Sequence, residues 1–78
     1  MLPPEILTGT MLISVQDNRF AQIENYKSIV EYNASRLRLQ GKNGRLIIDG
    51  EKLELLCYSI EECWIKGKIH NISYEPNP

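Results

Sequence analysis

The central segment of the chain alternates strictly between polar and apolar residues. Residues 36–40 read Arg-Leu-Arg-Leu-Gln, so an extended chain carries both leucines on one face and both arginines on the other. The turn sequence Gly-Lys-Asn-Gly follows at 41–44, and Asn-Gly between apolar runs is a strong hairpin signal. Residues 45–48 then return as a second strand. This pattern predicts an antiparallel hairpin with a type I′ turn, and Gly44 is expected at positive φ.

The same period of two continues on both sides of this hairpin, and no helical spacing persists across the intervening turns. The Asp-Gly pair at 49–50 predicts a second tight turn, Gly67 predicts a bulge, and a change of parity near Asn71 predicts a one-residue slip. Seven or eight short strands at this spacing are typical of a small antiparallel sandwich or barrel. Further strands are expected at residues 11–15, 20–24, 28–32, 53–57, 63–66 and 68–74.

The 78 residues are expected to form a single β domain, with an irregular lead-in at 1–9 and a polar tail at 75–78. A chain of this length buries only about 60% of its unfolded surface, so nearly every apolar side chain must contribute to the core. Period-two parity predicts the inward-facing set, which comprises Leu37, Leu39, Leu46, Ile48, Leu53, Leu55, Ile65 and Ile69.

The charges are balanced, with nine basic and ten acidic residues and a net charge of −1, so phosphate-driven nucleic-acid binding is not favoured. One cluster of cations leaves an alternative open. Arg36, Arg38, Lys42 and Arg45 fall within ten residues, and Tyr26 and Tyr32 could serve as stacking platforms for a single-stranded nucleic acid. The simpler interpretation of this cluster is a solvated strand face and hairpin tip.

No set of residues in the sequence suggests catalysis, a metal site or a cofactor. His70 has no nucleophile motif beside it, and adjacent carboxylates at 61–62 would point in opposite directions on an extended chain. Cys57 and Cys63 are not in a Cys-x-x-Cys motif, and His70 alone would not complete a zinc site. The chain begins without a signal-peptide pattern and contains no apolar run of about 20 residues. Both cysteines are therefore expected to be free and buried.

Trp64 has two interpretations. A single tryptophan buries a large area, which favours its use as the anchor of a small core. Tryptophan is also enriched at the centres of protein–protein interfaces, so the alternative is a binding residue.

Several motifs occur together in a fixed order along the chain. Residues 23–33 read Ile-Glu-Asn-Tyr-Lys-Ser-Ile-Val-Glu-Tyr-Asn, followed by Arg-Leu-Arg-Leu at 36–39 and Gly-Arg-Leu-Ile-Ile-Asp-Gly at 44–50. Leu-Glu-Leu at 53–55, Ile-Lys-Gly-Lys-Ile at 65–69 and Ile-Ser-Tyr at 72–74 complete the series, and a Leu-Pro pair stands near the start. In order and spacing, these motifs resemble the YabP/YqfC family of sporulation proteins, and its YqfC branch more closely.

The resemblance implies a compact β-sandwich of immunoglobulin-like architecture with no enzymatic activity. It also implies a role in spore development, in the mother-cell cytoplasm of an endospore-forming bacterium, together with a membrane-anchored partner resembling YqfD. The domain is then expected to act as a protein-interaction module, through a sheet edge or an exposed aromatic patch, with self-association left open. The candidate partner-binding residues are Tyr26, Tyr32 and Trp64.

Overall fold

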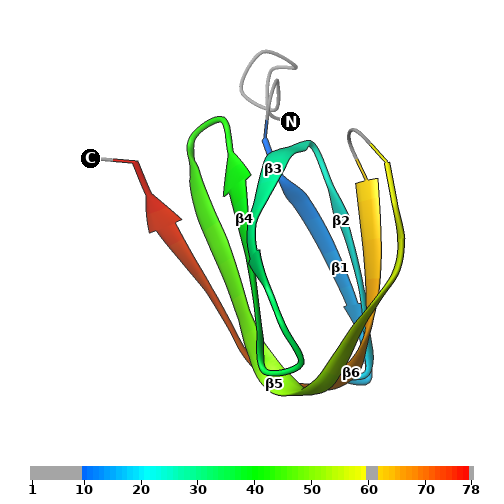
Figure 1. The fold of residues 1–78 in the computed structure, drawn as a ribbon. Helices are drawn as coiled ribbons and strands as arrows, with labels where there is room; N and C mark the ends of the chain where they lie inside the picture. Colours follow the sequence, from blue (N-terminus) through cyan, green and yellow to red (C-terminus); the bar gives the residue numbers. More distant parts are fainter. Residues whose placement is uncertain (1–9, 60–61, 78) are drawn as a thin grey trace.

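The computed structural model describes residues 10–59 and 62–77, and over this part of the chain the fold is all-β without a helix. Six antiparallel strands form one sheet in the order β1-β2-β6-β5-β4-β3 (Figure 1). The strands are β1 (Leu12–Gln16), β2 (Phe20–Glu24), β3 (Tyr26–Tyr32), β4 (Arg36–Gly41), β5 (Gly44–Tyr58) and β6 (Glu62–Pro76). The all-β antiparallel prediction is confirmed, whereas the lead-in expected at 1–9 lies outside the described residues.

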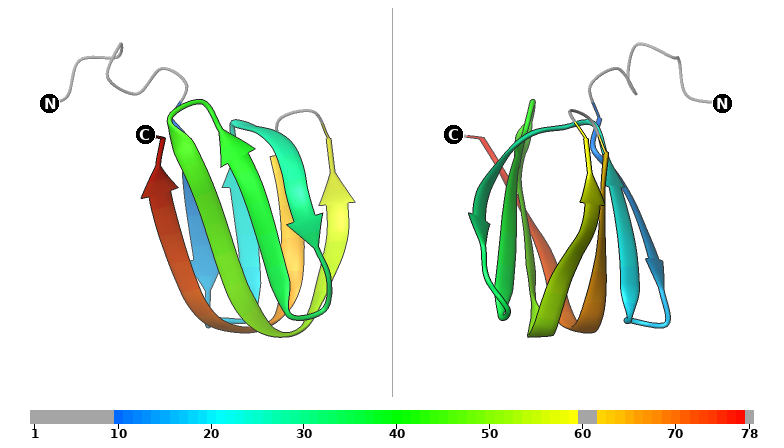
Figure 2. Two further views of the ribbon diagram at one scale, coloured as in Figure 1. Left: turned by 60° about the vertical axis from the view of Figure 1, so that its left-hand side comes forward. Right: turned by 45° about the vertical axis from the view of Figure 1, so that its right-hand side comes forward.

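The two long strands, β5 and β6, form a bent hairpin that is shared by two layers of the sheet. Residues 54–58 of β5 pair with the start of β6, which pairs with β2, and β2 pairs with β1. We call these four segments the β1 layer. Residues 45–49 of β5 pair with β4 on one side and with the end of β6 on the other; together with β3 these segments form the β3 layer. Figure 2 shows the two layers facing one another. Because both layers belong to one sheet, the immunoglobulin-like sandwich is not confirmed.

The predicted count of seven strands is wrong, because four expected strands merge into two. Asp49 and Gly50 were expected to form a tight turn, but both lie within β5 and remain paired with β6. Bulges absorb the bend instead. Asp49 lies opposite Asn71 and Gly50 opposite Ile69, so one extra residue stands on β6, and this confirms the predicted slip near Asn71. At the other end, β6 continues to Pro76, so the polar tail begins later than predicted.

The bulge expected at Gly67 is also present, at the centre of the bend. Glu51 pairs with Lys68 and Glu54 with Lys66, so two residues of β5 stand opposite Gly67. Gly67 has a φ of 143°, and a Cβ atom built on it would lie 2.7 Å from the carbonyl oxygen of Lys52. The position therefore requires glycine both for its conformation and for the close approach of the opposite backbone.

The space between the layers holds the core, which follows the predicted parity. Of the eight predicted core residues, Leu55 is partly buried and packs against the core, and the other seven are buried. Ala21, Ile23, Tyr26 and Cys63 complete the buried set. Alternation along a strand is a local property, so these inward-facing positions could be read from the sequence without knowing the pairing.

The turn prediction at Gly44 is wrong. Gly44 is not among the residues with positive φ; instead, two consecutive residues of the β1–β2 turn, Asp17 (52°) and Asn18 (54°), adopt this conformation. Gly44 begins β5, and a Cβ atom there would lie 2.5 Å from the carbonyl oxygen of Glu75 and 2.6 Å from the ring of Tyr74. Glycine is thus needed at position 44 for close packing against β6 and not for its φ angle.

Candidate functional site

Strand β1 forms one edge of the sheet and is exposed along its whole length. All five of its residues pair with β2 without a register shift, and no other described strand covers its outer side. Leu12 is 48% exposed, yet the strand contains no charged residue. A regular, uncharged and apolar edge presents free backbone N–H and C=O groups that another strand can pair with.

The inner side of β1 continues the face that lines the core. Ile13 lies opposite Ile23 and Val15 opposite Ala21, and both partners are fully buried. Side chains of directly opposed residues share a face, so Ile13 and Val15 point toward the core side. Both nevertheless remain more than a third exposed, because no strand follows β1. An added strand would extend this apolar face.

A hollow of about 300 Å³ adjoins the start of β1. It lies where β1 approaches the β4–β5 turn and the end of β6, and its lining comprises Thr10, Met11, Ile13, Gly41, Lys42, Asn43 and Tyr74. Tyr74 is 48% exposed and Met11 packs against the core, so the hollow combines apolar walls with access from solvent. Its volume is sufficient for one large apolar side chain of a bound segment.

The opposite edge, β3, is closed by two tyrosines. The Tyr26 hydroxyl donates a hydrogen bond to the carbonyl oxygen of Ser59. The Tyr32 hydroxyl accepts a hydrogen bond from the backbone N–H of Leu55 (2.9 Å) and donates one to the carbonyl oxygen of Leu53 (3.3 Å). Both tyrosines lie opposite inward-facing residues of β4. The Tyr32 hydroxyl joins β3 to β5 where β5 has left β4, and the Tyr26 hydroxyl joins β3 to Ser59, the residue after β5.

The two tyrosines differ in how much surface they offer. Tyr26 is 5% exposed and belongs to the core, so it presents almost no area to a partner. Tyr32 is 44% exposed, although its hydroxyl is occupied by β5. Two bulges in β3 place both on the same face, at opposite ends of the strand.

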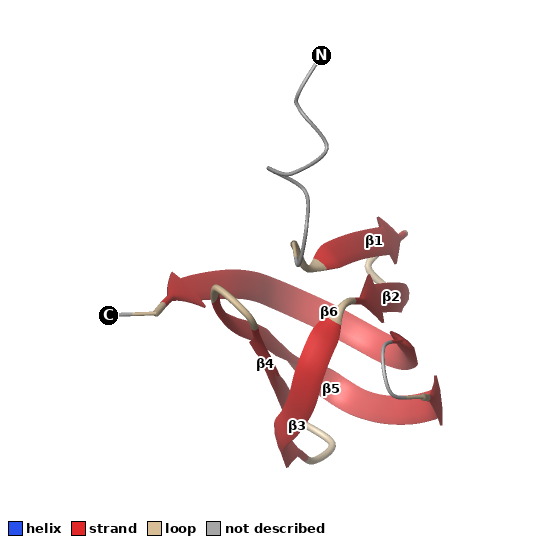
Figure 3. Ribbon diagram, turned by 90° about the horizontal axis from the view of Figure 1, so that it is seen from above, coloured by secondary structure: helices blue, strands red, loops and turns tan. Residues whose placement is uncertain are grey.

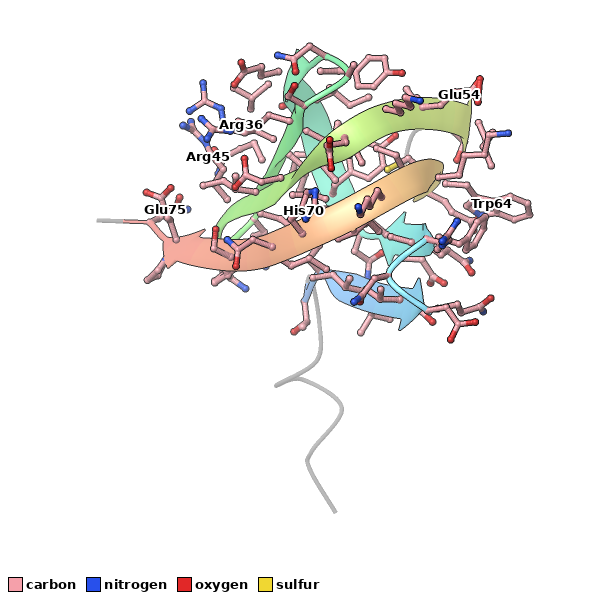
Figure 4. The ribbon with its side chains drawn as sticks, turned by 90° about the horizontal axis from the view of Figure 1, so that it is seen from below. Arg36, Arg45, Glu54, Trp64, His70 and Glu75 are labelled. Atoms are coloured by element: carbon pink, nitrogen blue, oxygen red, sulfur yellow. The ribbon has the colours of Figure 1, made fainter. Side chains whose placement is uncertain are left out.

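Trp64 does not anchor the core, so that interpretation is wrong. Its neighbours Cys63 and Ile65 take the inward positions, which directs Trp64 to the outer surface of the β1 layer. The indole is 39% exposed, meets the ring of Phe20 edge-on with centroids 6.0 Å apart, and donates its N–H to the Glu62 carboxylate. Seen from below in Figure 4, Trp64 projects from the side opposite Arg36 and Arg45.

Two arginines of the basic cluster pair with carboxylates on neighbouring strands. Arg36 contacts Asp49 and Arg38 contacts Glu31, each at 2.6 Å. The hydrogen bond and charge of Asp49 raise the pKa of Arg36 above its usual value. These side chains occupy the outer face of the β3 layer, whereas Tyr26 and Tyr32 lie on its inner face. The structure therefore does not bring together the arginines and the tyrosines of the nucleic-acid alternative.

His70 pairs with a carboxylate, and Cys63 is buried in the core. His70 Nε2 lies 2.7 Å from a Glu51 carboxylate oxygen, and this hydrogen bond, aided by the charge of Lys68, lowers the pKa of Glu51. Cys63 is a free, buried thiol, and burial raises its pKa to about 11. The side chain of Cys57 lies outside the described part. Within residues 10–59 and 62–77, no group of three potential metal ligands occurs.

Comparison with known proteins assigns the chain to a family. The model of the YabP family matches residues 8–78. The chain belongs to the YabP family. It is 25% identical over 73 residues to the uncharacterised protein YqfC of Bacillus subtilis (strain 168), an alignment that covers 94% of this chain and 78% of the relative. No solved structure matches the chain.

Sequence reasoning about this YabP family member did not identify β1 as an exposed edge strand. The available signal was the absence of charge from residues 12–16, but a sequence does not show which strand ends a sheet.

Among the described residues, no helix is long and apolar enough to cross a membrane.

Proposed function

We propose that this YabP family domain is a non-enzymatic interaction module of spore development, which binds a membrane-anchored protein by strand addition at β1. The observation that carries the proposal is the five-residue edge of β1, which is regular, exposed, apolar and uncharged. The mother-cell cytoplasm is the proposed site of action, with the domain held at the membrane by its partner. The family resemblance supports the process and the class of partner.

Strand addition uses backbone hydrogen bonds for affinity and side-chain pockets for selectivity. On β1 the backbone of residues 12–16 would provide the ladder. Ile13 and Val15 would meet apolar side chains on the inner side of the new strand, and the adjacent hollow of about 300 Å³ would receive one further apolar side chain. A partner segment with alternating apolar residues and little charge fits this edge.

The test compares two edge valines of similar exposure. Val15 lies on β1 and Val30 on β3, at 37% and 43% exposed. Binding of a YqfD-like membrane protein, the partner class that the resemblance implies, is measured by pull-down from detergent extracts and by a bacterial two-hybrid assay. Val15→Lys is expected to weaken binding at least about tenfold, equivalent to about 1.4 kcal/mol, whereas Val30→Lys retains it.

A further variant distinguishes a loss of binding from a loss of folding. Leu12→Lys alters an outward-facing residue of β1 and is expected to weaken binding while leaving the melting temperature nearly unchanged. Equal binding by all three lysine variants would contradict the proposal. Loss of binding in Trp64→Ala alone would move the interface to the Phe20–Trp64 surface, and retention of single-stranded RNA with a steep salt dependence would favour the nucleic-acid alternative.

A further inference from the structure

A second hollow, of about 550 Å³, lies at the folded end of the sheet, remote from the described ends of the chain (Figure 1). It is formed by the β1–β2 turn and by the bulged parts of β5 and β6. Its lining comprises Arg19, Glu51, Lys52, Lys66, Gly67 and Lys68, and we call it the basic groove. We propose that the basic groove binds the anionic headgroups of a membrane surface.

Charge is the first argument for this assignment. The groove is lined by four cations and one carboxylate, although the whole chain carries a net charge of −1. Glu51 lies within ion-pair distance of Lys68 and His70, and Glu54 outside the lining pairs with Lys66 at 3.3 Å. Arg19 and Lys52 make no ion pair with any described residue, so their charges remain available to a ligand.

The backbone at Lys52 is the second argument. Lys52 has a φ of 53°, a conformation that glycine or asparagine adopts at lower cost than lysine. It stands opposite Gly67 in the bulge, where the two backbones approach closely. A strained lysine at the rim of a cationic hollow is the kind of outlier that occurs where a side chain has a function.

The groove is also held in place by backbone contacts. The N–H of Gly67 donates to the carbonyl oxygen of Arg19 (3.0 Å), and the N–H of Ile69 donates to that of Asn18 (2.8 Å). These bonds fix the β1–β2 turn against β6. Figure 3, which views the molecule from the opposite end, shows β2 beside β6. The backbone that carries the cations is thus fixed in advance and requires little ordering on binding.

The chemistry of the lining favours lipid headgroups over a nucleic acid. No aromatic residue lines the groove, so bases would have no stacking platform. Three of the four cations are lysines, which act as flexible point charges toward an anionic surface, whereas arginine forms the planar bidentate contacts used on nucleic acids. Arg19 lies three residues after the end of β1, so the basic groove lies at one end of this strand. A headgroup contact there would direct β1 away from the bilayer. A partner segment that leaves the membrane would then run alongside β1.

The experiment is co-sedimentation of the full chain with vesicles of phosphatidylcholine alone or containing about one-third phosphatidylserine. The chain is expected to bind the anionic vesicles and to dissociate as salt is raised. Removing one positive charge is expected to weaken vesicle binding about fivefold, and reversing that charge is expected to weaken it further. The Lys52→Glu chain should therefore bind at least about tenfold more weakly than wild type. Lys27→Glu is the matched control, because Lys27 is exposed on β3 and makes no described ion pair; it should change binding less than about twofold.

A second variant separates function from folding. Lys52→Gly relieves the strained φ, so it is expected to raise the melting temperature while weakening vesicle binding about fivefold. Failure of the wild-type chain to bind anionic vesicles would overturn the inference, as would equal effects of Lys52→Glu and Lys27→Glu, or salt-sensitive binding of RNA in place of vesicles. Partner binding in detergent should be unchanged in Lys52→Glu, so this inference and the β1 proposal fail separately.

Discussion

The two edge strands of the sheet, β1 and β3, have opposite designs. β3 carries Lys27 and Glu31, contains two bulges, and is tied through the hydroxyls of Tyr26 and Tyr32 to Ser59 and to β5, respectively. β1 carries no charge and no bulge, and borders an open hollow. Charges and bulges are the usual devices that keep an edge from pairing with another chain. The contrast supports the proposal that β1, and not β3, is the edge that binds a partner.

The largest expected effect on stability tests the protected edge strand, β3. Tyr26→Ala removes a buried ring and its hydrogen bond to Ser59, and is expected to destabilise the domain by about 3–5 kcal/mol. Urea unfolding followed by circular dichroism measures this change. Tyr32→Ala serves as the comparison, because its ring is 44% exposed and should cost much less. Similar losses for both variants would show that the two tyrosines do not divide into a core and a surface residue.

The open side is tested at Gly44, where packing against Glu75 and Tyr74 sets the requirement for glycine. Gly44→Val is expected to cost about 1–3 kcal/mol through overpacking, and to perturb the hollow that Tyr74 lines. Thermal unfolding of Gly44→Ala and Gly44→Asn identifies the cause. If space is limiting, asparagine is worse than alanine. If asparagine is tolerated better, a left-handed conformation would be the reason instead.

A smaller effect is expected from removing one hydroxyl of the closed side. Tyr32→Phe loses the contacts to Leu53 and Leu55, and should reduce the free energy of unfolding by about 1 kcal/mol. Hydrogen exchange at the Leu55 amide should accelerate, because this N–H loses its acceptor. Tyr74→Phe is the control. An unchanged exchange rate at Leu55 would show that the hydroxyl does not join the layers.

The smallest change in stability is expected at Ser14, an exposed residue in the middle of β1. Ser14→Lys should alter the free energy of unfolding by less than about 0.5 kcal/mol. It should nevertheless reduce self-association at high concentration, because a lysine discourages edge-to-edge pairing. Sedimentation velocity measures this, with Ser28→Lys on β3 as the control. A reduction of equal size in both variants would remove the distinction between the edges.

Local pattern was sufficient to predict which side chains face inward. Leu37 and Leu39 alternate with the arginines, Leu46 and Ile48 continue the rule on the next strand, and all four are buried. The bulge at Gly67 was likewise visible as a glycine within a strand pattern, and the slip near Asn71 as a change of parity. Each of these inferences depends only on neighbours along the chain, and the alternation of side chains is a property of the extended backbone itself.

Long-range pairing decided where the sites lie. The Asp49-Gly50 pair became part of a bent strand because β6 remains paired with it. The outward position of Trp64, in contrast, follows from the same local alternation that directs its neighbour Ile65 to the core, so it could have been predicted. The edge status of β1 follows from the strand order, and the basic groove unites Arg19, Lys52 and Lys68 from three segments far apart in sequence. The period of a strand shows which way a residue points, but it contains no information on which strands lie beside it, and this neighbourhood determines an edge or a groove.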